Sequence, residues 1–225
     1  MSERLNKYLA FHLGVSRREA DDLISAGKIT IDGVPALLGA RLEEKQTVLV
    51  GSKPVVEKNA YTYLLFNKPV GYVSSRKQQG DSPTLYSLLP KEYHVLKTIG
   101  RLDKESSGLL LLTDDGDFAY EMTHPKFYKV KTYIVELDKA LEPLHQQMIS
   151  DFGITLEDGS SKLSLAKLDD ARVKWEVTMH EGRNRQIRRT FAALGYEVTA
   201  LHRTSFGAYT LDSIAPGDFK IIEKI

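Results

Sequence analysis

The chain has 225 residues, of which 42% are apolar, so it can bury the core of one large domain or of two smaller ones. Its 31 basic and 30 acidic side chains nearly cancel, so any basic surface for an acidic partner must be a local patch. The absence of cysteine excludes disulfides, thiolate nucleophiles and cysteine-bound zinc. With no signal-peptide core and no apolar run near the about 18 residues of a membrane span, we expect a soluble, cytoplasmic protein.

The first part of the chain, residues 1–52, predicts a small unit of two helices followed by short strands. Ser16, with Glu19 three residues later, is typical of a capping box at the start of the second helix. The segment KITIDG then alternates like a strand and turns at an Asp-Gly pair, and TVLV indicates another strand. The apolar residues at helical spacing in the first helix are Leu5, Tyr8, Leu9 and Leu13.

This unit resembles the S4 RNA-binding domain over about residues 3 to 52. The resemblance rests on RLNKYLA, on GVSRREA with the following LI and GKITIDG, and on the closing TVLV. It implies basic residues presented to structured RNA, where they neutralise phosphates and release counterions. On charge alone, Arg17 and Arg18 also suit an ordinary solvated helix face. The RNA contacts that the resemblance implies are Arg4, Lys7, Arg17, Arg18 and Lys28.

Residues 53–60, KPVVEKNA, are polar and predict a linker, and residues 61–225 predict a second domain. Its pattern is mostly strands with a few helices, which indicates an α+β fold with a mixed, mainly antiparallel sheet flanked by helices. The expected strands lie within residues 61–75, 108–113, 130–138, 161–169, 173–182 and 197–212. The expected helices lie within residues 82–90, 116–124, 143–153 and 184–195.

One acid, Asp103, stands in GRLDKESSGLLLLT just ahead of four leucines. A carboxylate beside a core costs several kcal/mol of stability unless it is paired. Neighbouring residues of a chain seldom face each other, so Arg101, although nearest in the sequence, is not the expected partner. A partner from elsewhere is therefore expected, and the pairing would either tie two elements together or hold a nucleophile or base ionised in a cleft. The arginines offered by the later segment GRNRQIRR are Arg183, Arg185, Arg188 and Arg189.

Two neighbouring segments favour ordinary structural roles. Ser106, Ser107 and Gly108 are expected to form a tight turn that lets the chain approach the core. The segment TDDGD, residues 113–117, lacks the spacing of a calcium loop and predicts a turn followed by a helix cap. The six histidines are scattered without metal-ligand spacing, so we expect no metal site.

Four ordered motifs in the second domain carry a specific resemblance. GRLDKESSGLLLLTDDG looks like the catalytic motif of RNA pseudouridine synthases, and NKPVGYVSS is similar to their lysine-proline motif. KVKTYIVELD is similar to their K-x-Y strand, and EGRNRQIRRTFAALGYEVTALHR to their late arginine motif. With the S4-like unit in front, nearly the whole chain resembles the RsuA-like family of ribosomal RNA pseudouridine synthases.

The resemblance implies cofactor-independent isomerisation of uridine to pseudouridine. Asp103 would be the essential nucleophile or base, paired with Arg188 or, as the alternative, with Arg189. Tyr133 would stack on the target base and help remove its C5 proton, although a strand tyrosine often only packs in a core. The target uridine must leave its stack to reach the site. The substrate-binding residues implied in this domain are Arg101, Lys68, Lys131, Arg185 and Arg189.

The expected partner is ribosomal RNA, either naked or within an assembly intermediate, with large-subunit RNA slightly favoured over small-subunit RNA. No membrane partner is expected, and the chain is expected to be a monomer. The alternative is a non-catalytic RNA-binding or ribosome-assembly factor that retains the synthase fold. An Asp-nucleophile hydrolase is disfavoured because no histidine lies near Asp103 in the sequence.

Overall fold

The computed structural model describes residues 2–225, which form two compact units. The N-terminal unit extends to Thr62 and also includes Val95–Lys97, and the second unit comprises Tyr63–His94 and Thr98–Ile225. The segment expected to be a linker begins as strand β6 (Lys53–Pro54), which pairs with a strand of the N-terminal unit. None of the helices formed by residues 2–225 has the length and apolar character that a membrane crossing requires.

The N-terminal unit packs two helices on short strands. The capping box is confirmed, because the Ser16 hydroxyl accepts from Glu19 N at 3.1 Å while the Glu19 carboxylate accepts from Ser16 N at 2.6 Å. The core of the unit is made by Leu5 and Leu9 of the first helix, Ile24 of the second and further apolar residues of the strands. The elements are α1 (Leu5–Leu13), α2 (Arg17–Ser25), β1 (Glu3–Arg4), β2 (Ile29–Ile31), β3 (Val34–Pro35), β4 (Arg41–Leu42) and β5 (Val48–Val50).

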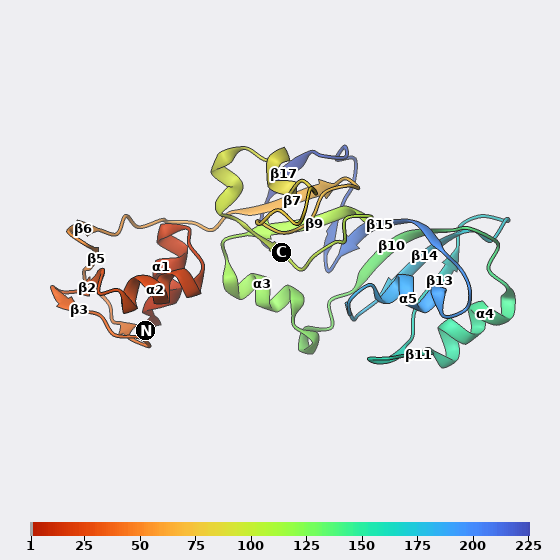
Figure 1. Cartoon of the computed structure of the whole chain (residues 1–225), viewed down its shortest axis with the longest axis horizontal. Coiled ribbons are helices and arrows are strands. Elements are labelled where there is room, and N and C mark those ends of the chain that lie inside the picture. The colour runs from red at the N-terminus through yellow and green to blue at the C-terminus, as the bar shows by residue number, and fades with distance from the viewer. Residues whose placement is uncertain (1) are drawn as a thin grey trace. The chain divides into compact units, whose positions relative to one another are not determined.

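One sheet runs through the second unit in the order β13-β14-β10-β15-β9-β7-β17, as Figure 1 shows from β17 across to β13. All pairings along it are antiparallel except that of β15 with β9. The expected α+β fold with a mixed, mainly antiparallel sheet is therefore confirmed. Its strands are β7 (Tyr63–Lys68), β9 (Ser107–Thr113), β10 (Lys131–Leu137), β13 (Ser164–Lys167), β14 (Lys174–Met179), β15 (Val198–Phe206) and β17 (Phe219–Ile222), with β8 (Lys97–Ile99) and β16 (Tyr209–Thr210) paired to β9 and β15.

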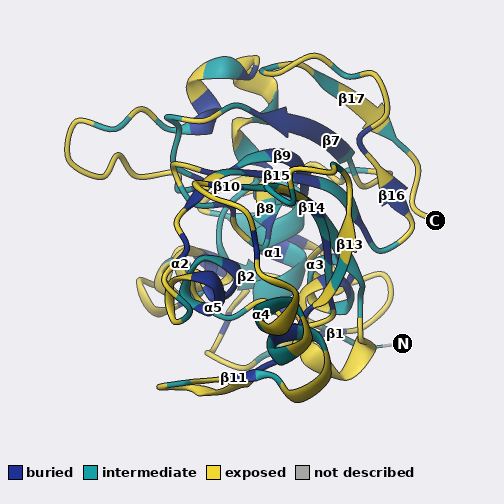
Figure 2. Cartoon of the chain, turned by 90° about the vertical axis from the view of Figure 1, so that its right-hand side faces the viewer, coloured by how far each residue is buried: buried dark blue, intermediate teal, exposed yellow. Residues whose placement is uncertain are grey.

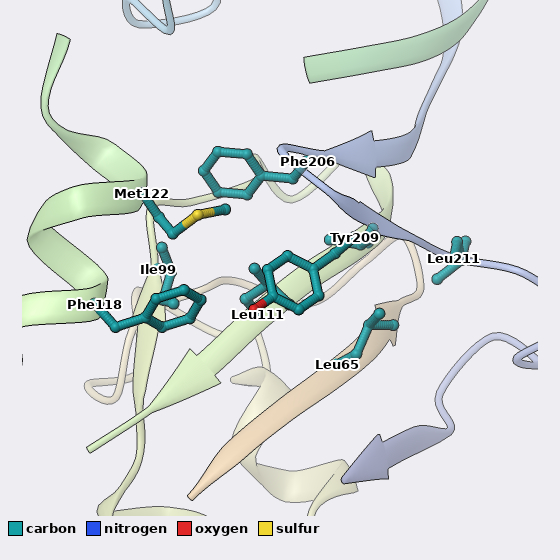
Figure 3. Packing of buried hydrophobic residues seen from close by; sticks show 9 residues of the cluster. Leu65, Ile99, Leu111, Phe118, Met122, Phe206, Tyr209 and Leu211 are labelled. Carbon is teal, nitrogen blue, oxygen red and sulfur yellow. The ribbon is translucent and has the colours of Figure 1, made fainter. Parts of the chain in front are cut away.

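Helix α3 (Gly116–Thr123) covers one face of this sheet. Phe118 and Met122 from the helix pack against Leu65 and Leu111 of the sheet and against Phe206 (Figure 3). The helix begins where expected, because the carboxylate of Asp115 accepts from the backbone N–H groups of residues 117 and 118 at 3.0 Å. Burial follows the sheet order: the inner strand β7 is buried and the edge strand β17 is largely exposed (Figure 2).

The remaining helical segments are shorter than the sequence pattern indicates. The expected helix over 143–153 is a short α-helix that continues as a π-helix, and the segment 82–90 contains only a 3₁₀ turn. Strand β17 and the small hairpin of β11 and β12 are additions that the sequence analysis did not contain. The bounds are α3 (Gly116–Thr123), α4 (Pro143–Gln147), α5 (Gln186–Ala192), η1 (Leu85–Leu88), η2 (Lys91–Val95), η3 (Pro125–Phe127), η4 (Met148–Phe152), β11 (Ile154–Leu156) and β12 (Gly159–Ser161).

The parallel seam between β15 and β9 depends on one glycine. Ser107 and Gly108 were expected in a turn, but they begin strand β9, with Gly108 opposite Arg203. A Cβ at Gly108 would lie 2.6 Å from Arg203 N and nearer still to the Arg203 carbonyl oxygen. The backbone φ of Gly108 is also +105°, which side chains rarely adopt. Only glycine therefore lets the two halves of the sheet meet here.

Replacing Gly108 by alanine should destabilise the fold by about 3 kcal/mol or more, because backbone strain and a clash with main-chain atoms add together. The matched control is Gly217→Ala, where φ is +91° but nothing lies within 4 Å of the added Cβ. That variant should lose only about 1 kcal/mol. Urea unfolding of both variants measures the difference, and equal losses would contradict a close approach at the seam.

Candidate active site

A cavity of about 950 Å³ opens on the face of β10 and β15. Its walls include the C-terminal end of α3, the N-terminal end of α5 and the loop that precedes β9. Asp103, Tyr133 and three of the predicted substrate-binding residues line it together. Those three are Arg101, Lys131 and Arg185. Residues far apart in the chain thus meet in one hollow, of a size ordinary for a ligand site.

The loop that carries Asp103 is held by its backbone. Each of the five consecutive carbonyl groups of residues 102–106 accepts a hydrogen bond. The donors come from the end of β7 and the segment after it, and from helix α5. They are Ser74 Oγ to Leu102 O, Lys68 Nζ to Asp103 O and Ser106 O, Gly71 N to Lys104 O, and Arg188 Nη2 to Glu105 O, at 2.7–3.1 Å. A loop satisfied in this way holds its side chains in defined positions.

Lys68 is the centre of this arrangement. It is fully buried, and its ammonium donates to Pro69 O, Asp103 O and Ser106 O at 2.8–3.1 Å. Burial lowers the pKa of Lys68 to about 8, against a smaller opposing effect of Asp103 and Glu105. Lys68 was expected to bind the substrate, but in this structure its ammonium binds the loop backbone and the residue does not line the cavity.

The guanidinium beside the Asp103 carboxylate belongs to Arg185. Arg185 Nη1 lies 3.7 Å from Asp103 Oδ2 and 3.0 Å from Glu105 Oε2. The Asp103 side chain remains 35% exposed, so it is available to a ligand in the cavity. Arg185 has a left-handed backbone, φ +47°, at the N-cap position of α5, and this conformation sends its side chain away from the helical series.

Arg188 and Arg189 were expected to pair with Asp103, but both bind other groups. Arg188 donates to Val198 O at 2.6 Å and to Glu105 O at 3.1 Å, so it ties α5 to β15 and to the loop. Arg189 donates to Asp158 Oδ2 at 2.7 Å and to Asn184 O at 2.9 Å. The partner does come from the late arginine segment, but the ion pair is made by Arg185.

Tyr133 lies on β10 directly opposite Arg203 of β15. Tyr133 is 7% exposed and Arg203 only 2%, and the guanidinium stands 5.9 Å from the centre of the Tyr133 ring and 5.0 Å from that of Phe206. Arg203 Nε donates to Leu109 O at 2.7 Å. The cavity therefore has a buried cation next to its aromatic ring.

Arg203 is the site residue that the sequence analysis missed. It stands in the segment EVTALHRTSF, within an expected strand. The signal that could have found it is periodicity, because Leu201 and Arg203 must share a strand face and Leu201 is buried.

The other predicted cations differ in exposure. Lys131 donates to the carbonyls of residues 129, 180 and 181 at 3.1–3.4 Å and stands 5.1 Å from the centre of the Phe206 ring. Burial, and secondly Arg203, lower the pKa of Lys131 to about 8. Arg101 is exposed on the cavity wall. Within residues 2–225 no group of three or more histidine, aspartate or glutamate side chains is arranged to hold a metal ion.

The basic residues expected to contact RNA in the N-terminal unit lie at its surface. Arg4, Arg17, Arg18 and Lys28 are exposed, and Lys7 is partly exposed and forms an ion pair with Glu3 at 3.6 Å. Arg17 and Arg18 occupy the first two positions of α2, directly after its cap. Cations there oppose the helix dipole, so their presence does not serve the stability of the helix.

Lys68→Met should destabilise the fold by about 1–3 kcal/mol near pH 7, because carbonyl groups of the loop lose a buried donor. The difference should also depend on pH. The folded chain releases the Lys68 proton near pH 8, whereas the unfolded chain keeps it up to about 10.5. Between these values the unfolded state binds more protons, so wild-type stability should rise with pH relative to the variant.

Urea unfolding of both proteins at about pH 7 and about pH 9.5 measures this effect. Lys131, with a similarly lowered pKa, is present in both chains, so its contribution cancels. A stability difference that stays constant or shrinks as pH rises would contradict the position of the ammonium.

Comparison with known proteins agrees with this geometry. Residues 62–193 match the RNA pseudouridylate synthase family, and residues 3–48 match the S4 domain. Ribosomal small subunit pseudouridine synthase A of Yersinia pestis is 37% identical over 96% of this chain and 93% of its own length. Ribosomal large subunit pseudouridine synthase B of Bacillus subtilis (strain 168) is also 37% identical, over 96% of this chain and 90% of its own length.

A solved structure of a pseudouridylate synthase shares the fold over nearly the whole chain. A crystal structure of a pseudouridylate synthase superposes with a TM-score of 0.70 and 30% identity, and the match covers 98% of this chain and 96% of that one. Both units are thus shared with proteins of one family. The chain belongs to the RsuA-like family of RNA pseudouridine synthases, with an S4 domain ahead of the synthase domain.

Proposed function

We propose that the chain isomerises a specific uridine of ribosomal RNA to pseudouridine, without a cofactor, and that Asp103 is the essential catalytic carboxylate. One observation carries the assignment of Asp103. The carbonyl groups of residues 102–106 all accept hydrogen bonds, while the Asp103 carboxylate, 35% exposed, faces a cavity that Tyr133 and Arg185 also line. An immobile main chain combined with an accessible charged group suits a nucleophile or base better than a purely structural ion pair.

The reaction breaks the bond between N1 of uracil and C1′ of ribose and forms a bond between C5 and C1′. A proton leaves C5 and one is gained at N1, so the hydrogen count does not change. The residues must therefore supply a carboxylate, a base for the C5 proton and a surface that holds the ring. Asp103 supplies the carboxylate, and the Arg185 guanidinium lies 3.7 Å from it. Tyr133 offers a ring to stack on the uracil and a phenol for the C5 proton.

The target nucleotide must leave its stack to enter this cavity, which costs least in single-stranded loops and bulges. Lys131 and Arg101 on the cavity wall are proposed to meet its sugar or phosphate. Arg188 and Lys68 are proposed as positioning residues that hold the Asp103 loop. Arg189, bound to Asp158 away from the cavity lining, is no longer proposed as a partner of Asp103.

The S4 unit is proposed to bind structured RNA near the target uridine through Arg4, Lys7, Arg17, Arg18 and Lys28. The placement of Arg17 and Arg18 supports this role, because two exposed cations at the positive end of a helix cost stability unless an anion meets them.

Within ribosomal RNA we propose the large-subunit RNA as the first target to test, on the basis of the arginine-rich segment GRNRQIRR. Relatives named for the small and the large subunit are equally similar to this chain, at 37% identity each. Mapping pseudouridine across both RNAs in cells with and without the gene identifies the uridine. We further propose that the enzyme acts in the cytoplasm as a monomer, on naked RNA or on an assembly intermediate.

Asp103→Asn should abolish pseudouridine formation, with a rate loss of at least about 10³-fold, because the amide can neither attack nor accept a proton. RNA affinity should change by less than about threefold, because phosphate contacts dominate it. The measurement is tritium release from RNA labelled at C5 of uridine, with binding followed separately.

Two control variants accompany this test. Glu105→Gln removes the neighbouring carboxylate that shares Arg185 and should retain measurable activity. Asp170→Asn removes an exposed carboxylate that is paired with Lys167 and does not line the cavity, and it should leave the rate unchanged. An Asp103→Asn enzyme that still made pseudouridine would sink the catalytic assignment.

Replacing both Arg17 and Arg18 by glutamate should move stability and RNA binding in opposite directions. Acidic residues suit the first turn of a helix, so the melting temperature should stay equal or rise slightly. RNA affinity should fall by at least about tenfold near 0.1 M salt, and its salt dependence should become shallower. Thermal melting and a salt titration of binding measure the two effects, and unchanged affinity would exclude this helix from the RNA interface.

A further inference from the structure

A cluster of exposed aromatic rings adjoins the cavity, which its members His124 and Lys126 line. Tyr120 and Phe127, from the end of α3 and the short helix η3, have ring centres 5.9 Å apart, and His124 lies 4.7 Å from Tyr120. The ammonium of Lys126 stands 5.1 Å and 4.7 Å from the centres of the Tyr120 and Phe127 rings. Both rings remain substantially exposed. The cluster therefore offers flat apolar surface together with a positive charge.

Tyr128 directly follows Phe127 of this cluster in the chain. It lines the same cavity as Asp103, and it is 74% exposed. Its backbone is left-handed, with φ +49°, which costs a tyrosine about 1 kcal/mol or more. The turn is fixed by Tyr128 N, which donates to Pro125 O at 3.1 Å. A strained backbone that places a large ring in solvent beside a reactive group indicates a role in binding.

The charge around these rings selects the kind of ligand. The nearby carboxylate of Glu121 is bound by Lys129 at 2.8 Å, and Lys126 faces the rings. Aromatic faces with neighbouring cations are the usual surface for single-stranded RNA, whose bases stack and whose phosphates are neutralised. When the target uridine flips out, a base next to it loses one stacking neighbour, and a ring at the cavity mouth can replace that neighbour.

We propose that Tyr128, supported by the cluster of Tyr120, His124, Lys126 and Phe127, stacks on an unpaired base adjacent to the flipped uridine. The inference rests on the proposed function, because it extends the RNA path outward from the Asp103 cavity. Tyr128 is in this role a positioning residue: it holds the neighbouring nucleotide and takes no part in bond breaking.

Tyr128→Asn tests the proposal, because asparagine tolerates the left-handed backbone but has no ring. The full-length variant should bind a fluorescein-labelled single-stranded oligouridylate about 5- to 100-fold more weakly than wild type. With ribosomal RNA from cells lacking the gene, KM should rise by a similar factor while kcat stays within about twofold. Stability should not fall, because the strained tyrosine is gone. Tyr128→Phe should behave as wild type in all three measurements.

Phe152→Asn is the matched control, because Phe152 is equally exposed at 75% but does not line the cavity, and it should change neither affinity nor KM. Unchanged binding and KM in Tyr128→Asn would overturn the proposal, as would a loss of kcat without a rise in KM. Failure of the proposed function has a different signature: wild type would make no pseudouridine, while probe binding would still depend on the ring at position 128.

Discussion

A buried ammonium group holds the backbone of the loop that carries Asp103. Lys68 is the last residue of strand β7, and its ammonium donates to the carbonyls of Asp103 and Ser106. In the part of the chain described, the Lys68 ammonium has no carboxylate at hydrogen-bond distance. It donates instead to three carbonyl oxygens, and these hydrogen bonds offset the cost of removing the charge from water. The geometry of Asp103 therefore depends on a residue that never faces the cavity.

The same region is where the two halves of the sheet join. The parallel pairing of β15 with β9 is short, and it places Arg203 against the glycine that follows the Asp103 loop. Because β15 also carries the residues that face Tyr133, the seam sets the distance between the loop and the aromatic ring. The close approach of the β9 and β15 backbones therefore fixes both the pairing of the strands and the position of Tyr133 relative to the Asp103 loop.

Local sequence signals predicted local structure well. The capping box at Ser16, the helix cap at Asp115 and the alternation in β10 each depend on residues only a few positions apart, and each is confirmed. The motif resemblance likewise identified the loop of Asp103 and the strand of Tyr133, which the structure places on one cavity.

Signals that depend on tertiary contacts were harder to interpret. Arg188 was expected to be the partner of Asp103, but the partner is Arg185, which stands just before α5 with a left-handed backbone. The burial of Lys68 could not be predicted, because it follows from carbonyls 35 and 38 residues away. Strand β17 was missed because it is a short, half-exposed edge whose pattern FKII is stabilised mainly by pairing with β7.

The contact between Asp103 and Arg185 is long, at 3.7 Å, whereas Arg185 holds Glu105 at 3.0 Å. Exposed ion pairs of this kind contribute at most about 1 kcal/mol. A carboxylate rotating about its Cα–Cβ bond thus gives up little, while the guanidinium stays anchored by the neighbouring glutamate. The Asp103 carboxylate can therefore change its rotamer at low cost, while its main-chain carbonyl remains hydrogen-bonded to Lys68.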